Sequence, residues 1–154
     1  MKKTMIRNLI HAVYAIIGNS RLNELKKTDD KVAVLKILRE LRYVAKKYEE
    51  DVKDAHDRLK PDDFDELRSL ATVYEAERND GKQPTAMTPA EYQKFVATLV
   101  SYNQAVEKAM SDIDKSTVEL EFEPLAGDVL LQLMDANRWT VDQYLKTEEA
   151  LTGE

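Results

Sequence analysis

Three glutamates alternate with three apolar residues in the stretch TVELEFEPL, residues 117–125. Neighbouring carboxylates perform acid–base chemistry when their surroundings separate their pKa values. Here Glu119, Glu121 and Glu123 project from one face of an extended segment, and no neighbouring residue supplies a nucleophile. We therefore predict that these glutamates contact a partner and do not catalyse a reaction.

The residue types that most metal and cofactor sites need are scarce. The chain has no Cys, which excludes thiolate zinc sites and Cys nucleophiles. Neither His11 nor His56 follows a Glu at the three-residue spacing that di-metal helical bundles use, and the four glycines are too far apart for a phosphate-binding loop. The acidic segments 49–51 and 62–66 are typical of a solvated helix face and a helix N-terminus. We predict no catalytic residue, no metal site, no cofactor and no enzymatic activity.

The charge of the chain is distributed unevenly along its length. Residues 1–47 hold 12 Lys and Arg against 4 Asp and Glu, whereas residues 107–154 hold 4 against 12. Such a chain can fold its ends together, stack on copies of itself, or offer its basic part to an anion. The cations of the basic part spread around a predicted helix with Tyr43 as their one aromatic neighbour, so nucleic-acid binding is the alternative function and not the first.

The elements that position these residues are mostly helical, and one predicted helix is the clearest. It begins at the capping residue Thr28 and ends before Pro61, which cannot continue a helix. Its apolar residues recur at alternating spacings of four and three, which is a heptad seam. The seam consists of Val34, Leu38, Leu41, Ala45, Tyr48, Val52, Ala55 and Leu59, and it is widened near its start by Val32, Leu35 and Ile37.

Other segments also have the apolar spacing or the capping residues of helices. The N-terminal residues 4–17 read as a packed amphipathic helix and not as a signal peptide, because polar residues interrupt their apolar run. Thr88 and Thr140 each stand three residues before a Glu or Gln, which is the pattern of a capping box. The predicted helices are therefore 4–17, 28–60, 61–78, 89–113, 126–138 and a last helix that follows the capping residue Thr140, with a strand at about 117–123.

A lone strand has unpaired backbone groups that need partners. Three arrangements stay open: pairing within the chain with the extended segment 83–87, addition to a sheet edge of another chain, or a lone extended arm. We predict a protein oligomer, most simply a dimer, with the strand or the seam at its interface. The predicted interface residues are Val118, Leu120, Phe122, Glu119, Glu121, Glu123, Val34, Leu38 and Leu41.

The order of these parts resembles small helical proteins that are encoded in phage and prophage structural gene clusters. The matching pieces are MIRNLIHAVYAI, VLKILRELRYVAKKYEEDV, VELEFEPL and DVLLQLMDANRWTVDQY, which cover about half of the chain. The resemblance implies a role in virion assembly in a bacterial cytoplasm. It supplies no catalytic residue.

We therefore predict a mainly α protein, a helical bundle built on one long heptad helix, with a single acidic β-strand and a short C-terminal helical pair. Residues 1–115 form the bundle, and residues 116–154 form an appended part of the same domain. No stretch reaches the length of apolar sequence that a membrane span needs. The predicted function is that of a cytoplasmic, non-enzymatic assembly or adaptor protein whose partner is itself or another protein.

Overall fold

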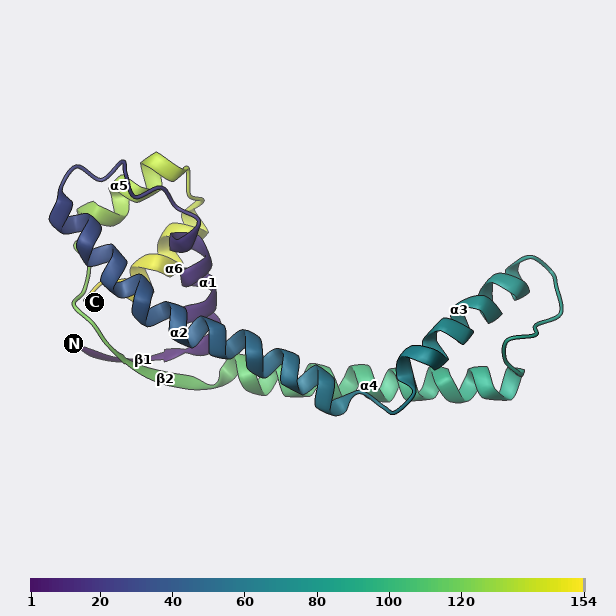
Figure 1. The fold of residues 1–154 in the computed structure, drawn as a ribbon. Coiled ribbons are helices and arrows are strands. Elements are labelled where there is room, and N and C mark those ends of the chain that lie inside the picture. The colour runs from purple at the N-terminus through teal and green to yellow at the C-terminus, as the bar shows by residue number, and fades with distance from the viewer. Residues whose placement is uncertain (154) are drawn as a thin grey trace. The chain divides into compact units, whose positions relative to one another are not determined.

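A computed structural model describes residues 1–153 and confirms the mainly α class (Figure 1). Within this range the chain forms six helices and one two-stranded antiparallel sheet. In chain order the elements are β1 Lys2–Ile6, α1 Arg7–Gly18, α2 Thr28–Leu59, α3 Phe64–Asn79, α4 Pro89–Lys115, β2 Thr117–Glu121, α5 Gly127–Asn137 and α6 Val141–Leu151.

The chain divides into two compact units, and the long helices α2 and α4 contribute residues to both. Unit 1 comprises Met1–Asp51 and the described part of Asp112–Glu154, and unit 2 comprises Val52–Ser111. This division differs from the expected one between residues 115 and 116. The acidic strand and the C-terminal helices belong to the same unit as the N-terminus, because the N-terminal residues pair with the strand.

The first residues of the chain form β1, so the prediction of a helix beginning at Thr4 is wrong. β1 pairs antiparallel with β2, with Lys2 opposite Glu121 and Ile6 opposite Thr117. Met5 is buried while its neighbours on either side are exposed, which is the period of a strand. The acidic strand is thus paired within the chain, but its partner is β1 and not the segment 83–87.

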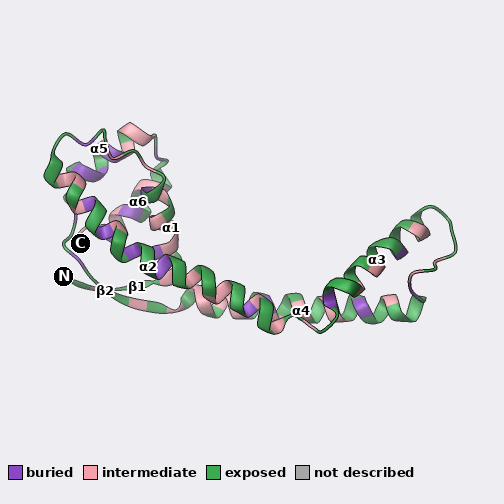
Figure 2. Ribbon diagram, viewed as in Figure 1, coloured by how far each residue is buried: buried purple, intermediate pink, exposed green. Residues whose placement is uncertain are grey.

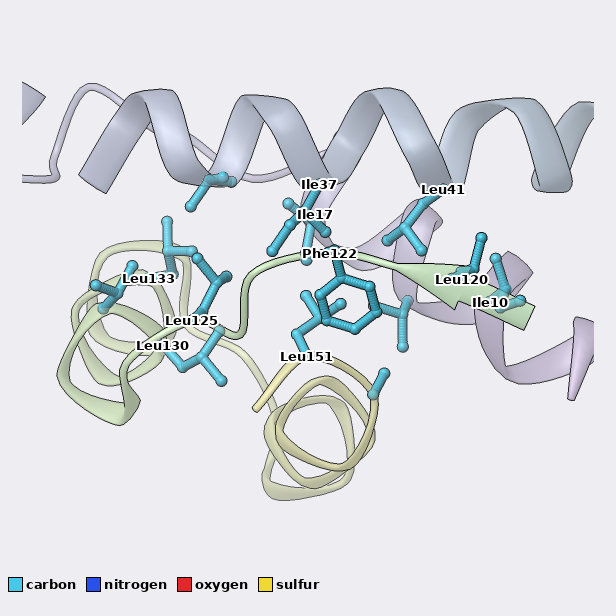
Figure 3. Close-up of a cluster of buried hydrophobic side chains, with 14 of the residues drawn as sticks. Ile10, Ile17, Ile37, Leu41, Leu120, Phe122, Leu125, Leu130, Leu133 and Leu151 are labelled. Carbon is cyan, nitrogen blue, oxygen red and sulfur yellow. The ribbon is translucent and has the colours of Figure 1, made fainter. Parts of the chain in front are cut away.

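Unit 1 has its own hydrophobic core (Figure 2). The core takes side chains from β1, β2 and the residues after it, and from α1, α2, α5 and α6. Figure 3 shows Ile37 and Leu41 of α2 pointing toward Leu120 and Phe122 of the acidic segment. The fully buried members are Ile10, Val13, Val34, Leu41, Leu130, Leu133, Ala150 and Leu151.

The predicted extent of α2 is confirmed, since the helix begins at Thr28 and ends at Leu59, just before Lys60 and Pro61. The seam is covered by the chain itself along much of its length. Val34, Leu41, Ala45 and Ala55 are buried, and the other four seam residues are half-buried. Burial of the seam in the monomer leaves less apolar surface for association than the sequence suggested.

Unit 2 has a separate aromatic core on the facing sides of α3 and α4. Phe64 contacts the rings of Phe95 and Tyr102 with centroid distances of 5.8 and 4.9 Å. Tyr74 stacks on Tyr92 with a centroid distance of 4.4 Å. These contacts give the helical hairpin a core of its own, to which Ala71 and Met87 also belong.

Two predicted capping boxes are present. At the start of α4 the N–H of Glu91 donates to Thr88 Oγ1 at 3.1 Å, and the N–H of Thr88 donates to Glu91 Oε1 at 3.4 Å. At the start of α6 the reciprocal pair joins Thr140 and Gln143 at 3.1 and 2.9 Å. Each box satisfies two backbone donors that a helix start leaves unpaired.

Candidate protein-binding groove

The nine predicted interface residues are divided between the core and the surface of unit 1. Val34, Leu41, Leu120 and Phe122 are buried in the monomer's own core, and Leu38 and Val118 are half-buried against it. Their apolar side chains are thus largely occupied inside the chain. Glu119, Glu121 and Glu123 are exposed.

One edge of β2 lacks a partner strand in the described structure. The N–H of Phe122 donates to the carbonyl of Met1 at 3.1 Å, and the N–H of Arg7 donates to the carbonyl of Ser116 at 2.9 Å. In an antiparallel pair the hydrogen-bonded positions alternate, so the backbone groups of residues 118, 120 and 122 point to β1. Those of Thr117, Glu119 and Glu121 point the other way, to the free edge.

A groove of about 610 Å³ lies between the first half of α2 and the end of β2 with the residues that follow it. We call it the α2 groove. Its lining includes Glu121, whose backbone groups point to the free edge of β2, and no residue of β1. Its lining residues are Asp29, Val32, Ala33, Lys36, Ile37, Arg39, Glu40, Glu121, Phe122, Glu123 and Pro124.

The α2 groove combines an apolar interior with charges of both signs. Ile37 and Phe122 are also part of the core and are buried, whereas Val32 keeps 44% of its surface exposed. Lys36 and Arg39 come from α2, and carboxylates come from both walls. Within residues 1–153 none of the charged lining side chains takes part in an ion pair within 4 Å. The groove therefore presents charges that are available to a partner.

The outer face of α2 continues the exposed surface beyond the groove. Leu35 is 43% exposed and Tyr43 is 78% exposed, which is the highest value among the exposed large apolar residues. On a helix Tyr43 follows Arg39 by one turn, and exposed Arg42 and Lys46 flank it. The sequence indicated this second apolar side, because Val32, Leu35 and Ile37 lie outside or beside the heptad seam.

Sequence reasoning missed the groove itself and most of its charged wall. Lys36 and Arg39 belong to the cations that the sequence spreads around α2. No local signal assigns them to a common site with residues 121–124, because that neighbourhood depends on how the acidic segment crosses α2. The one available hint was the match between a basic N-terminus and an acidic strand.

A second cluster of polar side chains in unit 1 has a structural role. Arg7 Nη2 lies 2.8 Å from Asp51 Oδ2, and the Tyr48 hydroxyl donates to Asp114 Oδ1 at 2.5 Å. His11 packs on the ring of Tyr48 with centroids 4.6 Å apart. These contacts join the start of α1, the middle of α2 and the end of α4.

The pKa values of two members of this cluster, Tyr48 and Asp51, are shifted by their partners. The hydrogen bond to Asp114 raises the pKa of Tyr48, and burial adds to the effect. The hydrogen bond from Lys47 holds the pKa of Asp51 below its usual value, and Arg7 acts in the same direction. The shifts favour the neutral phenol of Tyr48 and the ionised carboxylate of Asp51, which are the states that make these contacts. The cluster therefore has a structural role.

The described residues contain no group of three or more His, Cys, Asp or Glu side chains that could hold a metal ion. No helix in the described part of the chain combines the length and apolar character needed to cross a bilayer. Comparisons of the chain with family models, with curated proteins and with solved structures give no match.

Proposed function

We propose that this protein is a non-enzymatic assembly or adaptor protein that binds other protein chains through the α2 groove. The observation that carries the proposal is a groove that has an apolar interior and charges without ion-pair partners, and that adjoins the end of an unpaired strand edge at Glu121. Protein interfaces join apolar centres to polar rims in this way, and complementary charges orient the partners. The resemblance to phage-encoded proteins extends the proposal to a role in virion assembly.

The simplest partner is a second copy of the chain. Val32 and Leu35 are each more than two-fifths exposed on adjacent turns of α2, and their burial would favour association by roughly 25 cal/mol per Å². The charged walls of the groove supply both signs, so a second copy can match cations of one groove with carboxylates of the other. Such pairing weakens as ionic strength rises.

Sedimentation velocity over a range of protein and salt concentrations tests this form of the proposal. We expect a species larger than the monomer that dissociates as salt is raised. The double variant Val32→Asp with Leu35→Asp should sediment as a monomer. The matched control changes the exposed pair Val141 and Leu145 of α6 to Asp and should associate as the wild type does. A wild type that stays monomeric at every concentration contradicts self-assembly.

Nucleic-acid binding is the second candidate, and one observation favours it. Lys36, Arg39, Arg42 and Lys46 are all exposed on α2 around the exposed ring of Tyr43. In single-stranded nucleic-acid sites, cations bind the phosphates and a neighbouring aromatic ring stacks on the bases. Fluorescence anisotropy with labelled single-stranded and duplex DNA separates the two functions. Submicromolar binding that falls steeply with salt and is lost when Arg39 and Arg42 become Gln would replace the protein-binding proposal.

A further inference from the structure

We propose that the free edge of β2 accepts an extended segment of another protein, which pairs antiparallel with β2, reaches the α2 groove at Glu121 and carries alternating apolar and basic residues. This inference rests on the proposed function and names the class of partner. Its basis is the juxtaposition of an unpaired strand edge with a helical wall, an arrangement in which a peptide gains both backbone hydrogen bonds and side-chain contacts.

The backbone of β2 supplies the hydrogen-bonding groups. The register with β1 directs the N–H and C=O groups of Thr117, Glu119 and Glu121 away from β1. Exposed edges of this kind pair readily with another chain unless a residue such as proline blocks them, and β2 contains no proline. β2 is five residues long, and at a rise of about 3.4 Å per residue it offers roughly 17 Å of edge.

One side of the incoming strand would face α2. Because directly opposed residues of paired strands share a face, alternate residues of the segment lie on the same side as Leu120 and Phe122. Next to the end of β2 the groove presents Val32, Ala33 and Ile37 of α2. Apolar side chains at these positions would bury surface against them.

The other side of the incoming strand would lie beside the glutamates. Opposite charges on directly opposed residues stabilise a strand pair, and like charges destabilise it. Glu119 and Glu121 are exposed on β2, and Glu123 continues the row just beyond it. The strand that already pairs with β2 follows this rule, since it places Lys2 opposite Glu121. Lys or Arg at the alternate positions of the segment would extend the same complementarity to the free edge.

The same charge row excludes β2 of a second copy as the occupant. Antiparallel pairing of two identical free edges would place glutamates of one chain directly beside glutamates of the other. It would also add carboxylates to a groove that already holds Asp29, Glu40, Glu121 and Glu123 against Lys36 and Arg39. The charges thus select a basic strand.

The probe for the experiment is a capped heptapeptide in which four Lys alternate with three Val. Isothermal titration calorimetry with the full chain measures its affinity, and amide chemical shifts locate its site. We expect saturable binding, with shifts at Glu119, Glu121 and Val32. A peptide with Glu in place of Lys should not bind. Absence of saturable binding of the Lys peptide up to about 1 mM overturns the inference.

Two N-methylated peptides test whether the contact is a strand pair. In an antiparallel pair the Lys residues stand opposite Glu119 and Glu121, so their N–H groups face β2 and the Val N–H groups face away. N-methylation of the two central Lys residues should abolish binding, whereas N-methylation of two Val residues should leave it. Equal effects of the two modifications, or the reverse order, overturn the inference.

A pair of isosteric variants tests the glutamates. The variant Glu119→Gln with Glu121→Gln should bind the Lys peptide about three- to tenfold more weakly, since each opposed pair contributes modestly. The control Glu24→Gln with Asp135→Asn removes the same charge at exposed positions outside the groove and should bind as the wild type does. Equal affinity of both variants overturns the charge argument. If the Lys peptide does not bind but the wild type self-associates and the Val32 and Leu35 double variant does not, the proposed function stands and only this inference is overturned.

Discussion

Two substitutions in the N-terminal strand can separate the strand at residues 2–6 from the helix that the sequence predicts over residues 4–17. A helical reading of residues 4–17 places Met5 and Ile6 together on one apolar face. In the strand they point to opposite faces, and Met5 is 3% exposed while Ile6 is 50% exposed. Replacing each by Ala should therefore give very different losses of stability.

The expected magnitudes follow from burial. Replacing a buried Met by Ala typically costs about 2–5 kcal/mol, because transfer free energy is lost and a cavity remains. Full burial of an Ile side chain contributes roughly 1.5–3 kcal/mol, so a half-exposed Ile6 should lose about 1 kcal/mol or less. The Met5→Ala variant is thus expected to be less stable than Ile6→Ala by at least about 1 kcal/mol.

Urea unfolding followed by the fluorescence of Trp139 measures this difference. Trp139 is the one Trp of the chain and is buried in the same core cluster as Met5, so its emission reports on unit 1. A local reporter is needed because a chain with two compact units need not unfold in one step. Equal losses in the two variants, or a larger loss for Ile6→Ala, would refute the strand and favour the helical reading.

Three further outcomes are expected from the contacts of unit 1. Thr140→Ala removes a capping box and should cost about 1 kcal/mol in the Trp139 transition, whereas Thr140→Ser should restore it. The depressed pKa of Asp51 stabilises the fold above the usual value of 3.8, and this contribution is lost as pH falls through the lower folded-state pKa; Asp51→Asn should flatten the acid limb of a stability–pH profile. Leu120→Pro removes a backbone donor at a hydrogen-bonded position and a core side chain, so circular dichroism and Trp139 emission should show loss of unit 1, and not release of folded monomers.

The extent of α2 and the starts of α4 and α6 were predictable because their signals are local. The heptad seam of α2, the proline after it and the two capping boxes each depend on residues a few positions apart. The spacing that predicts a helix is also the geometry that forms it, so no distant contact was needed. The fold class follows from these elements.

The pairing of β1 was not predictable from the N-terminal residues alone. The spacing of Met5, Ile6, Leu9 and Ile10 fits a helical face, and only the presence of β2 makes the period of two the better solution for residues 2–6. Pairing partners that are more than 100 residues apart leave no local signal. The charge match between Lys2 and Glu121 was visible in the sequence but does not specify a register by itself.

The sequence predicts an interface at these residues because an acidic strand and a long apolar seam both need to be covered. The structure covers the apolar members within the chain and leaves the glutamates and the second apolar side of α2 exposed. The sequence shows Val32 and Leu35 as extra apolar positions, but the groove beside them depends on residues 121–124. The apolar and acidic residues of the candidate site are therefore recognisable from local sequence, but only the tertiary structure brings them together.

Replacing the glutamate row tells a binding role from a folding role, because the first changes peptide affinity and the second changes the free energy of unfolding. Glu119 and Glu121 stand on the solvent side of β2, where they repel each other, and only Lys2 stands opposite one of them. Exposed charges contribute little to stability, so the change of both glutamates to Gln should alter the free energy of unfolding by no more than about 0.5 kcal/mol. A partner strand with Lys at alternate positions would lose its opposed charges in the same variant. Unchanged stability together with weakened peptide binding assigns the row to recognition, whereas a large loss of stability would assign it to the fold.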